Sequence, residues 1–308
     1  MLGVNLAAGD LVEGKLKAAY KTDDGTAYNC SIEEFIASNN FEALAGKVDL
    51  ILTSPPYPLV SPKSYGNRVG EDYKQWLTGI VTQLSSLLKP KGSVVIEIGN
   101  AWNRGIPTMS TLPLETLIQI GSDAGLQVCQ QFIWNNPNKL PGPATWVNIK
   151  RVRVKDAYTH IWWYSKTPNP EADNKRVLQP YTDSMLKLLS RQSYNQGERP
   201  SGHDIGAGFL KKNLGSIPSN VLTFSNTAES GEYRKWCKDH GVAQHPARMP
   251  EKLADFFIEL LTKKKALVLD PFGGSNTTGR SAEKLGRKWI YIERDRDFVL
   301  GSRGRFPK

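Results

Sequence analysis

The sequence has few cysteines and no long apolar run. Its 308 residues include three scattered cysteines, Cys30, Cys129 and Cys237, with no C-x-x-C pair. This pattern argues against a disulfide framework and against a zinc site, so we expect a reducing, cytoplasmic setting and no metal. No stretch reaches the roughly 18 apolar residues of a membrane-spanning helix. The first residues lack the basic segment and apolar core of a signal peptide, and we expect no membrane partner.

What the sequence has in excess is positive charge. It holds 40 Lys and Arg against 30 Asp and Glu, a formal net charge of +10, which favours a polyanionic partner. Residues 139–215 carry 13 of the basic and 6 of the acidic residues, and hence most of the excess. Within them, Lys150–Lys155 alternates basic residues with valine, a pattern typical of a strand with one basic face. An ordinary solvated strand is the alternative.

The flanking regions alternate apolar runs with amphipathic stretches. Short apolar runs predict buried strands, whereas apolar residues at helical spacing, bounded by proline or glycine, predict helices. The predicted strands cover residues 48–53, 93–98, 128–134, 160–164, 266–270 and 289–292, and the predicted helices cover residues 71–88, 112–124, 250–262 and 276–285. Such alternation is typical of an α/β domain whose mostly parallel sheet is covered by helices on both faces.

The first chemical motif is Thr53-Ser-Pro-Pro-Tyr57, directly after a predicted buried strand. Ligands of open α/β sheets bind at the carboxyl ends of strands. Two successive prolines fix the backbone and remove two N–H donors. The Ser54 hydroxyl and the carbonyls of Ser54 and Pro55 are left as acceptors beside the ring of Tyr57. This set can hold a flat heterocycle by its amino group, and a proline-stiffened turn without a ligand is the alternative.

The second motif, Leu267–Gly279, joins a predicted strand to a predicted helix through two glycines. Glycines let the backbone approach a ligand, and Ser275 or Asn276 can cap the helix. The spacing is neither G-x-G-x-x-G nor a P-loop, which disfavours an NAD-type site. The next predicted strand ends in Glu293, where a carboxylate can accept hydrogen bonds from both hydroxyls of a ribose. Together these features predict a site for a nucleoside cofactor.

With these motifs, the sequence resembles the β class of S-adenosylmethionine-dependent DNA amino-methyltransferases over nearly its whole length. Residues 53–57 are similar to the family's catalytic motif, and residues 270–275 are similar to its cofactor motif, in the order of the β class. Residues 245–250 match the element before the cofactor strand, and five segments between residues 139 and 220 look similar to the PvuII-type cytosine-N4 enzymes. Serine before the two prolines is usual for cytosine-N4 enzymes. Asp or Asn there is usual for adenine-N6 enzymes, which are the alternative.

The resemblance implies a Rossmann-like methyltransferase fold with a mostly parallel sheet, plus a smaller DNA-recognition region. Residues 1–138 and 216–308 would form the catalytic domain, and residues 139–215 would form the approximate target-recognition region. Double-stranded DNA is the implied partner and S-adenosyl-L-methionine the implied cofactor. The resemblance also points to functional pairing with a restriction endonuclease.

The resemblance assigns roles to residues that match the family's motifs. Methyl transfer would follow base flipping and direct in-line attack, without a covalent intermediate. The predicted catalytic residues are Ser54, Pro55, Pro56, Tyr57 and the proton acceptor Glu97. The predicted cofactor-binding residues are Asp270, Phe272, Gly273, Gly274, Ser275, Thr277 and Glu293. The predicted DNA contacts are Arg151, Arg153, Arg191, Arg199, His203, Lys211 and Lys212.

One departure from the family pattern lies near the N-terminus. Enzymes of this family often carry Gly-Asp before a helix, where this chain has Asn29 and Cys30. The missing carboxylate leaves open a DNA-binding relative without catalysis, or compensation by Glu33 or Glu34. Cys30 itself is interpreted as a buried residue rather than a nucleophile. We find no Pro-Cys nucleophile of the carbon-5 methyltransferases, and an RNA or small-molecule methyltransferase on the same scaffold is a further alternative.

Overall fold

The computed structural model of the protein describes residues 11–12, 14–57, 68–191, 211, 213–226 and 231–306. The chain forms two compact units, one of Met1–Ala172 with Asn220–Lys308 and one of Asp173–Ser219. None of the described helices is long and apolar enough to cross a membrane.

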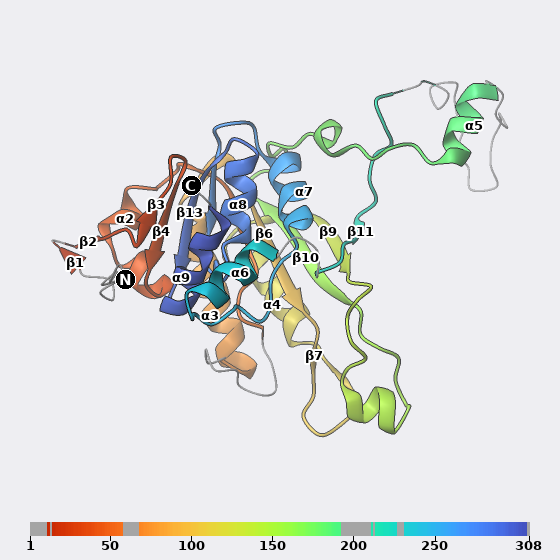
Figure 1. Ribbon diagram of the computed structural model, residues 1–308, viewed down its shortest axis with the longest axis horizontal. Coiled ribbons are helices and arrows are strands. Elements are labelled where there is room, and N and C mark those ends of the chain that lie inside the picture. Colours follow the sequence, from red (N-terminus) through yellow and green to blue (C-terminus); the bar gives the residue numbers. More distant parts are fainter. Residues whose placement is uncertain are drawn as a thin grey trace. The chain divides into compact units, whose positions relative to one another are not determined.

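A sheet of nine strands forms the centre of the first unit (Figure 1). In spatial order its strands are β11 (Val221–Thr223), β9 (Gln127–Asn135), β10 (Tyr158–Ser165), β6 (Leu88–Gly99), β5 (Val48–Thr53), β12 (Leu267–Asp270), β13 (Lys288–Glu293), β4 (Gly25–Asn29) and β3 (Tyr20–Lys21). The five strands from β6 to β4 run parallel, whereas β10 and β3 are antiparallel to their neighbours. The predicted mostly parallel sheet is thus confirmed. Two small hairpins lie outside it, β1 (Leu11–Val12) with β2 (Lys15–Leu16) and β7 (Ala101–Trp102) with β8 (Met109–Ser110).

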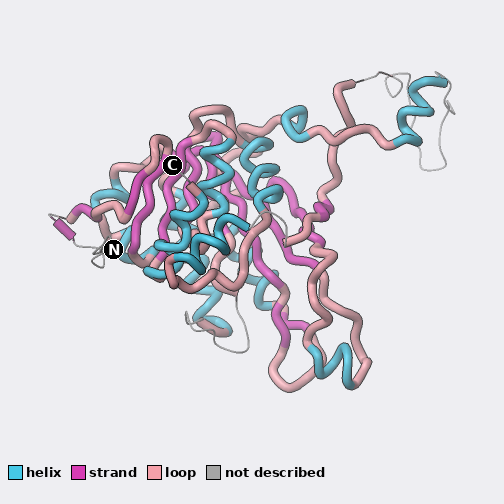
Figure 2. The backbone as a smooth tube through the Cα atoms, in the orientation of Figure 1, coloured by secondary structure: helices cyan, strands magenta, loops and turns pink. Residues whose placement is uncertain are grey.

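Helices cover both faces of this sheet (Figure 2). On one face, α3 (Gly70–Ser85) and α4 (Leu112–Asp123) pack on each other and on a core that includes Ile51 and Ile96. On the other face, α7 (Glu251–Leu261) contacts β5, and α8 (Thr277–Lys284) contacts β12 and β13. The remaining α-helices among the described residues of this unit are α1 (Ile32–Ile36), α2 (Asn39–Glu42), α6 (Gly231–Asp239) and α9 (Arg296–Ser302). Coverage on both faces explains why the central strands are apolar almost throughout.

The predicted elements of the first unit are present with shifted ends. The predicted helix at residues 71–88 ends at Ser85, and the strand predicted at 93–98 already begins at Leu88. The reason is that Leu88 pairs with Val48 across an irregularity in the β5–β6 ladder, so residues 89–92 continue the strand. A Pro-x-Gly stretch at a bulge therefore belongs to the strand here rather than to a turn.

The prediction of a strand at Lys150–Lys155 is wrong. The structure has a π-helical turn at Thr145–Ile149 followed by irregular backbone. Arg151 has a φ of 53°, in the left-handed region that interrupts a strand. Val152 and Val154 are 61% and 87% exposed, so neither a neighbouring strand nor a core covers this segment. The basic residues of this segment therefore lie on an exposed loop.

The second unit is built around α5 (Asp183–Arg191). An isolated bridge between Gln179 and Ser216 brings its two ends together. Gly215 is required at this point, because a Cβ there would lie 2.6 Å from the Gln179 carbonyl oxygen. The unit also contains a short 3-10 helix at Asn174–Val177.

The second unit does not coincide with the predicted recognition region. It begins at Asp173, whereas the predicted region begins at Lys139. The difference arises because Lys139 pairs with Asp156 at 3.1 Å, which ties both ends of the intervening loop to the ends of β9 and β10. Residues 139–172 consequently belong to the first unit.

Gly25 of β4 makes room for the Trp289 side chain of β13. A Cβ at Gly25 would lie 1.8 Å from Trp289 Cε2. We expect Gly25→Ala to lower the free energy of unfolding by about 1–3 kcal/mol, as overpacking of cores does. Gly79→Ala is the control, because nothing lies within 4 Å of a Cβ at this α3 position. We expect the control to keep or raise the Tm measured by scanning calorimetry. Equal Tm values for the two variants would contradict the packing argument.

Candidate active site

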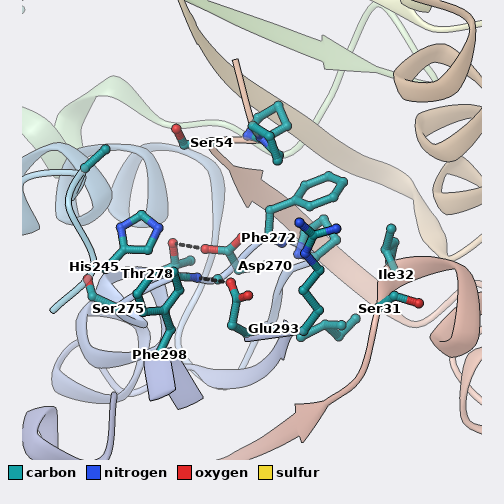
Figure 3. Close-up of a pocket in the computed structure, with 18 of the residues that line it drawn as sticks. Ser31, Ile32, Ser54, His245, Asp270, Phe272, Ser275, Thr278, Glu293 and Phe298 are labelled. Carbon is teal, nitrogen blue, oxygen red and sulfur yellow. Dashed lines mark hydrogen bonds between the residues drawn. The ribbon is translucent and has the colours of Figure 1, made fainter. Parts of the chain in front are cut away.

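A cavity of about 300 Å³ lies at the carboxyl ends of the central strands (Figure 3). Its wall includes Ser54 and Tyr57 after β5, Asp270 and the glycine turn after β12, and Glu293 at the end of β13. Helix α3 and the segment before α7 contribute further side chains. The two motifs of the sequence therefore line one cavity, as expected when parallel strands end at the same edge of a sheet.

Asp270 joins the two motifs. Its Oδ1 accepts hydrogen bonds from the Thr53 hydroxyl at 2.7 Å and the Phe272 N–H at 3.2 Å. Its Oδ2 accepts one from the Thr278 hydroxyl at 2.7 Å (Figure 3). Burial raises the pKa of Asp270 to about 6, although the three donors oppose the shift. Both carboxylate oxygens bind the protein itself, which fixes the turn after β12 against the end of β5.

The turn after β12 requires its two glycines. A Cβ on Gly273 would lie 2.0 Å from Tyr291 Cδ2, and Gly274 has a φ of 51°. The Gly274 N–H donates to Glu293 Oε2 at 2.9 Å, and the Asp295 N–H donates to Glu293 Oε1 at 2.9 Å. Burial raises the pKa of Glu293. Its carboxylate is therefore held in one orientation at the cavity wall.

Asn276, rather than Ser275, caps α8. The Asn276 side chain accepts a hydrogen bond from the Gly279 N–H at 3.0 Å, and its backbone is left-handed with a φ of 56°. The Ser275 hydroxyl lies 3.3 Å from the Thr277 hydroxyl and accepts a hydrogen bond from Arg305 at 3.0 Å. Ser275 and Thr277, two of the predicted cofactor residues, thus line the cavity, and their hydroxyls form hydrogen bonds within the protein.

Glu97, near the end of β6, accepts hydrogen bonds from two hydroxyl groups of the first motif. Ser54 Oγ donates to Glu97 Oε2 at 2.5 Å, and Tyr57 Oη donates to Oε1 at 2.5 Å and Oε2 at 2.6 Å. Glu97 is 2% exposed, and burial raises its pKa, although the bonds from Ser54 and Tyr57 oppose the shift. Ser54 lines the cavity and lies between it and Glu97. An ionised carboxylate only accepts, so the Ser54 hydrogen points to Glu97 and its lone pairs are left for a ligand.

Tyr57 has a second contact besides its hydroxyl. Its ring lies directly against Gly99, where a Cβ would be 2.5 Å from Tyr57 Cε2. Burial and the neighbouring Glu97 carboxylate raise the pKa of Tyr57 well above its ordinary value, so the phenol stays protonated and donates. The sequence predicted this ring beside the acceptors for a flat heterocycle, and the structure shows that its hydroxyl also fixes the Glu97 carboxylate.

Several residues that line the cavity were not among the predicted site residues. Trp76 follows the helical spacing of α3 and gives no separate signal, yet its ring lies 5.6 Å from that of Phe272. The Arg68 guanidinium lies 5.7 Å from the centre of the Trp76 ring. His245 packs against Gly274, where a Cβ would lie 3.0 Å from its Nε2. The similarity of residues 245–250 to a family element is the signal that could have identified His245.

Comparisons with known proteins agree with this geometry. A family model described as DNA methylase matches residues 48–302. The Type II methyltransferase M.PvuII of Proteus hauseri is 42% identical over 311 residues, which cover 99% of this chain and 91% of that protein. The chain belongs to the DNA methylase family. The family resemblance and the fold class expected from the sequence are thereby confirmed.

Two further relatives extend this comparison. A solved structure described as PvuII DNA methyltransferase (cytosine-N4-specific) matches with a TM-score of 0.75 and 36% identity, covering 96% of this chain and 90% of that one. The Type II methyltransferase M.BglII of Bacillus subtilis is 28% identical, over 82% of this chain and 61% of that protein.

The two residues that depart from the family pattern lie at the end of β4. Cys30 is buried, and burial raises the pKa of its thiol to about 12, so it carries no charge and is not a nucleophile. Asn29 Nδ2 donates to the carbonyls of Glu293 and Arg294, both at 3.0 Å. No group of three or more His, Cys, Asp or Glu that could hold a metal ion occurs among the described residues.

The two acids considered for compensation have different surroundings. Glu33 lines the cavity and accepts a hydrogen bond from Trp76 Nε1 at 2.7 Å. Glu34 accepts from the Ser31 N–H and forms a capping box for α1 instead. Of these two acids, Glu33 is therefore the one that lines the cavity, together with Cys30.

The predicted DNA contacts lie in both units. Arg151 is exposed on the loop before β10. Arg153 places its guanidinium 3.3 Å from the centre of the Trp102 ring and donates to the Pro107 carbonyl at 3.3 Å. Arg153 thus joins this loop to the β7–β8 hairpin. The exposed candidates of the second unit are Arg191 and Lys211, and those outside the described residues are Arg199, His203 and Lys212.

The raised pKa of Asp270 predicts a pH dependence of stability. The carboxyl titrates near 3.8 in the unfolded chain and near 6 in the folded chain. The folded protein binds more protons between these values, so the free energy of unfolding falls as pH rises from about 4 to 6. Asp270→Asn removes this titration. The quantity to follow is the difference in free energy of unfolding, unmodified protein minus variant. We expect this difference to fall by on the order of 3 kcal/mol between about pH 4 and pH 6.

Urea denaturation at a series of pH values measures this difference. Asp239→Asn, at an exposed position of α6, is the control. Its difference in free energy of unfolding from the unmodified protein should stay constant with pH. A constant difference for Asp270→Asn as well would refute the effect of burial on this carboxyl.

Proposed function

We propose that this protein transfers a methyl group from S-adenosyl-L-methionine to the N4 atom of cytosine in duplex DNA. The observation that carries the proposal is the placement of Ser54, Tyr57 and Glu97 beside the cavity that also contains the fixed Glu293 carboxylate. The identity with M.PvuII and the match to a solved cytosine-N4-specific enzyme support the assignment of the base.

The cavity fits S-adenosylmethionine. Glu293 holds two fixed carboxylate oxygens at the cavity wall, where they would accept hydrogen bonds from the ribose hydroxyls, and the turn through Gly273 and Gly274 lines the same cavity. The rings of Trp76 and Phe272 offer apolar surface to a purine. When bound, the cofactor supplies a methyl group on a positively charged sulfur, so the task of the protein is orientation and desolvation. The residues that support the turn around it are Asp270, Ser275 and Thr277.

The target base reaches the first motif by leaving the duplex, because an amino group inside the stack is not accessible to the cavity. Ser54 Oγ and the Pro55 carbonyl accept its two amino hydrogens, which localises the nitrogen lone pair for in-line attack. Ser54 can accept because its own hydrogen is donated to Glu97. Pro56 has no N–H donor to compete, and Tyr57 packs its ring on the base.

Glu97 receives the proton that the reaction releases. The methylated amino group is strongly acidic, and it passes a proton to Ser54 Oγ as the Ser54 hydrogen moves to Glu97. Burial raises the pKa of Glu97, which makes it a stronger base than an exposed carboxylate. Tyr57 holds the same carboxylate in place throughout. These reaction steps need no covalent bond between the protein and the base.

DNA is bound, in this proposal, by the target-recognition region at about residues 139–215, while residues 1–138 and 216–308 carry the chemistry. The side chains that contact DNA are Arg151, Arg153, Arg191, Arg199, His203, Lys211 and Lys212. Because M.PvuII and M.BglII are Type II methyltransferases, we extend the proposal to a restriction-modification system. The protein would then act in the bacterial or archaeal cytoplasm and protect the sites of a restriction endonuclease.

The modified base identifies the reaction. We expect duplex DNA treated with the protein and S-adenosylmethionine to yield N4-methylcytosine on digestion to nucleosides and mass spectrometry. N6-Methyladenine would overturn the base assignment, and transfer to RNA or free nucleosides alone would overturn the DNA assignment. Binding of both ligands without transfer would indicate a relative that has lost catalysis.

In the same assay, Glu97→Gln tests the proton acceptor. The substitution removes a base but keeps the shape of the side chain, so we expect kcat to fall by roughly 100-fold or more. Glu259→Gln of α7 is the matched control, since the pKa of Glu259 is also raised by burial and this residue does not line the cavity. DNA affinity should be unchanged in both variants. Equal activity of the two would remove Glu97 from the mechanism.

The exposed basic loop predicts the salt dependence of DNA binding. Arg151→Ala should weaken binding to nonspecific duplex DNA and lower the slope of log affinity against log salt by about one. Lys47→Ala is the control, because Lys47 is exposed next to the amino end of β5, at the edge of the sheet opposite to Ser54. Fluorescence anisotropy between low and moderate salt measures both slopes. Identical slopes for the two variants would contradict the role of the loop.

A further inference from the structure

The β7–β8 hairpin begins beside the candidate active site. Gly99 is the last residue of β6, and it packs against the Tyr57 ring, where a Cβ would lie 2.5 Å from Tyr57 Cε2. After one intervening residue, Ala101 starts the hairpin. Because β6 runs parallel to β5, the hairpin leaves the sheet at the edge where Ser54 and Glu97 lie.

Hydrogen bonds within the hairpin close its turn. The Asn103 N–H donates to the Thr108 carbonyl at 3.0 Å, and Asn103 Nδ2 donates to the Thr108 hydroxyl at 2.9 Å. Residues 104–107 form the turn, and all four are exposed. Arg104 and Ile106 are therefore presented to the solvent from a closed turn.

The basic loop, residues 139–156, starts and ends at the same edge of the sheet. β10 is antiparallel to β6 and pairs Thr159 with Gly99, and β9 pairs Asn135 with Tyr158 of β10. The chain between β9 and β10 therefore leaves and re-enters the sheet next to the start of the hairpin (Figure 1).

Arg153 joins the basic loop to the hairpin. Its guanidinium lies 3.3 Å from the centre of the Trp102 ring and donates to the Pro107 carbonyl at 3.3 Å. Trp102 is in the first strand of the hairpin, and Pro107 is in its turn. These contacts hold the hairpin against the loop, so residues 101–110 and 139–156 form one hairpin–loop surface.

The hairpin–loop surface is both basic and apolar. It contains six Lys and Arg and one acidic residue, Asp156, which is paired with Lys139. Among the described residues, thirteen large apolar side chains are exposed, and six of them lie on this surface. These six are Ile106, Met109, Leu140, Ile149, Val152 and Val154. Exposed apolar side chains that gather in one place mark an interaction site, and the excess of positive charge favours a polyanion as the partner.

Duplex DNA is the polyanion that the position of this surface favours. In the proposed reaction, cytosine enters the cavity while its nucleotide stays in the strand. The phosphates on either side of that nucleotide consequently lie at the mouth of the cavity, where the hairpin leaves the sheet. An anionic membrane also attracts basic and apolar side chains, but it gives no reason for their place beside Ser54.

We propose that the β7–β8 hairpin, held by Arg153 on Trp102, is a second DNA-binding element that places Arg104 on a backbone phosphate beside the flipped cytosine. The proposal rests on the proposed function for the identity of the base. It adds a DNA contact from a segment that precedes the target-recognition region and to which the sequence assigned only catalysis. Ile106 of the same turn then faces the same duplex.

The salt dependence of DNA binding tests the contact of Arg104. In Arg104→Ala we expect the affinity for a nonspecific duplex, measured by fluorescence anisotropy, to fall by about threefold or more at low salt. The slope of log affinity against log salt should fall in magnitude by about one. Arg104→Lys keeps the charge and should keep the slope. Lys264→Ala, exposed in the turn before β12 at the opposite edge of the sheet, is the control and should match the unmodified protein.

Variants of Trp102 test whether Arg153 holds the hairpin in place. Trp102→Ala removes the ring, so Arg104→Ala should weaken DNA binding by less than about twofold in this background. Trp102→Phe keeps an aromatic face, and the full effect of Arg104→Ala should return in it. The same effect of Arg104→Ala in both backgrounds would overturn the proposed link.

Photo-crosslinking tests the contact without any methyl transfer. Ile106→Cys carries a benzophenone in a Cys129→Ser background, because Cys30 and Cys237 are buried. We expect ultraviolet light to link this position to bound duplex DNA. Ile118→Cys, at a 62% exposed position of α4, is the matched control and should give no crosslink.

Equal affinities and slopes of Arg104→Ala and Lys264→Ala, or bound DNA without a crosslink at position 106, would overturn the proposal. Binding of phosphatidylglycerol vesicles in place of DNA would overturn it as well. DNA binding by the unmodified protein without methyl transfer would instead refute the proposed function, and the variants would still test the hairpin.

Discussion

The hydrogen bond from the Thr53 hydroxyl to the Asp270 carboxylate is the contact on which the site depends. It spans 217 positions of sequence and joins the carboxyl end of β5 to the turn after β12. The parallel pairing of these strands brings the two groups together, and the second oxygen of Asp270 extends the connection to α8. This alignment sets Ser54 and the glycine turn at one edge of the sheet, where both line the cavity.

Two buried carboxylates, Asp270 and Glu97, and the half-buried Glu293 line or support this edge, and neutral donors bind their oxygens. Asp270 binds two hydroxyls and an amide, Glu293 binds two amides, and Glu97 binds two hydroxyls. Hydroxyls and amides orient a carboxylate without cancelling its charge, so burial prevails and raises all three pKa values. Such acids keep their affinity for protons and for ligand hydroxyls, which a strong ion pair would reduce.

The sequence predicted the sheet and both motifs because apolar periodicity and proline or glycine turns are local signals. The strand expected at Lys150–Lys155 was wrong, since periodicity cannot report the left-handed backbone of Arg151 or the missing neighbour strand. The bond between Tyr57 and Glu97 was also beyond local reasoning, because it depends on the β5–β6 register and on the space left at Gly99. In the same way, no pattern showed that Arg153 stacks on Trp102.

Asn29 and Cys30, which stand where the family often has Gly-Asp, lie far from Ser54. These residues lie at the end of β4, and β12 and β13 lie between β4 and β5, the strand that Ser54 directly follows. Three strand spacings separate the backbones of β4 and β5 by about 14 Å. A neutral Cys30 therefore changes the charge on the side of the cavity shared with Glu293 and Glu33, where the cofactor would bind. The bonds among Ser54, Tyr57 and Glu97 involve neither residue, so under the proposed function we expect Asn29 and Cys30 to affect cofactor affinity rather than proton removal.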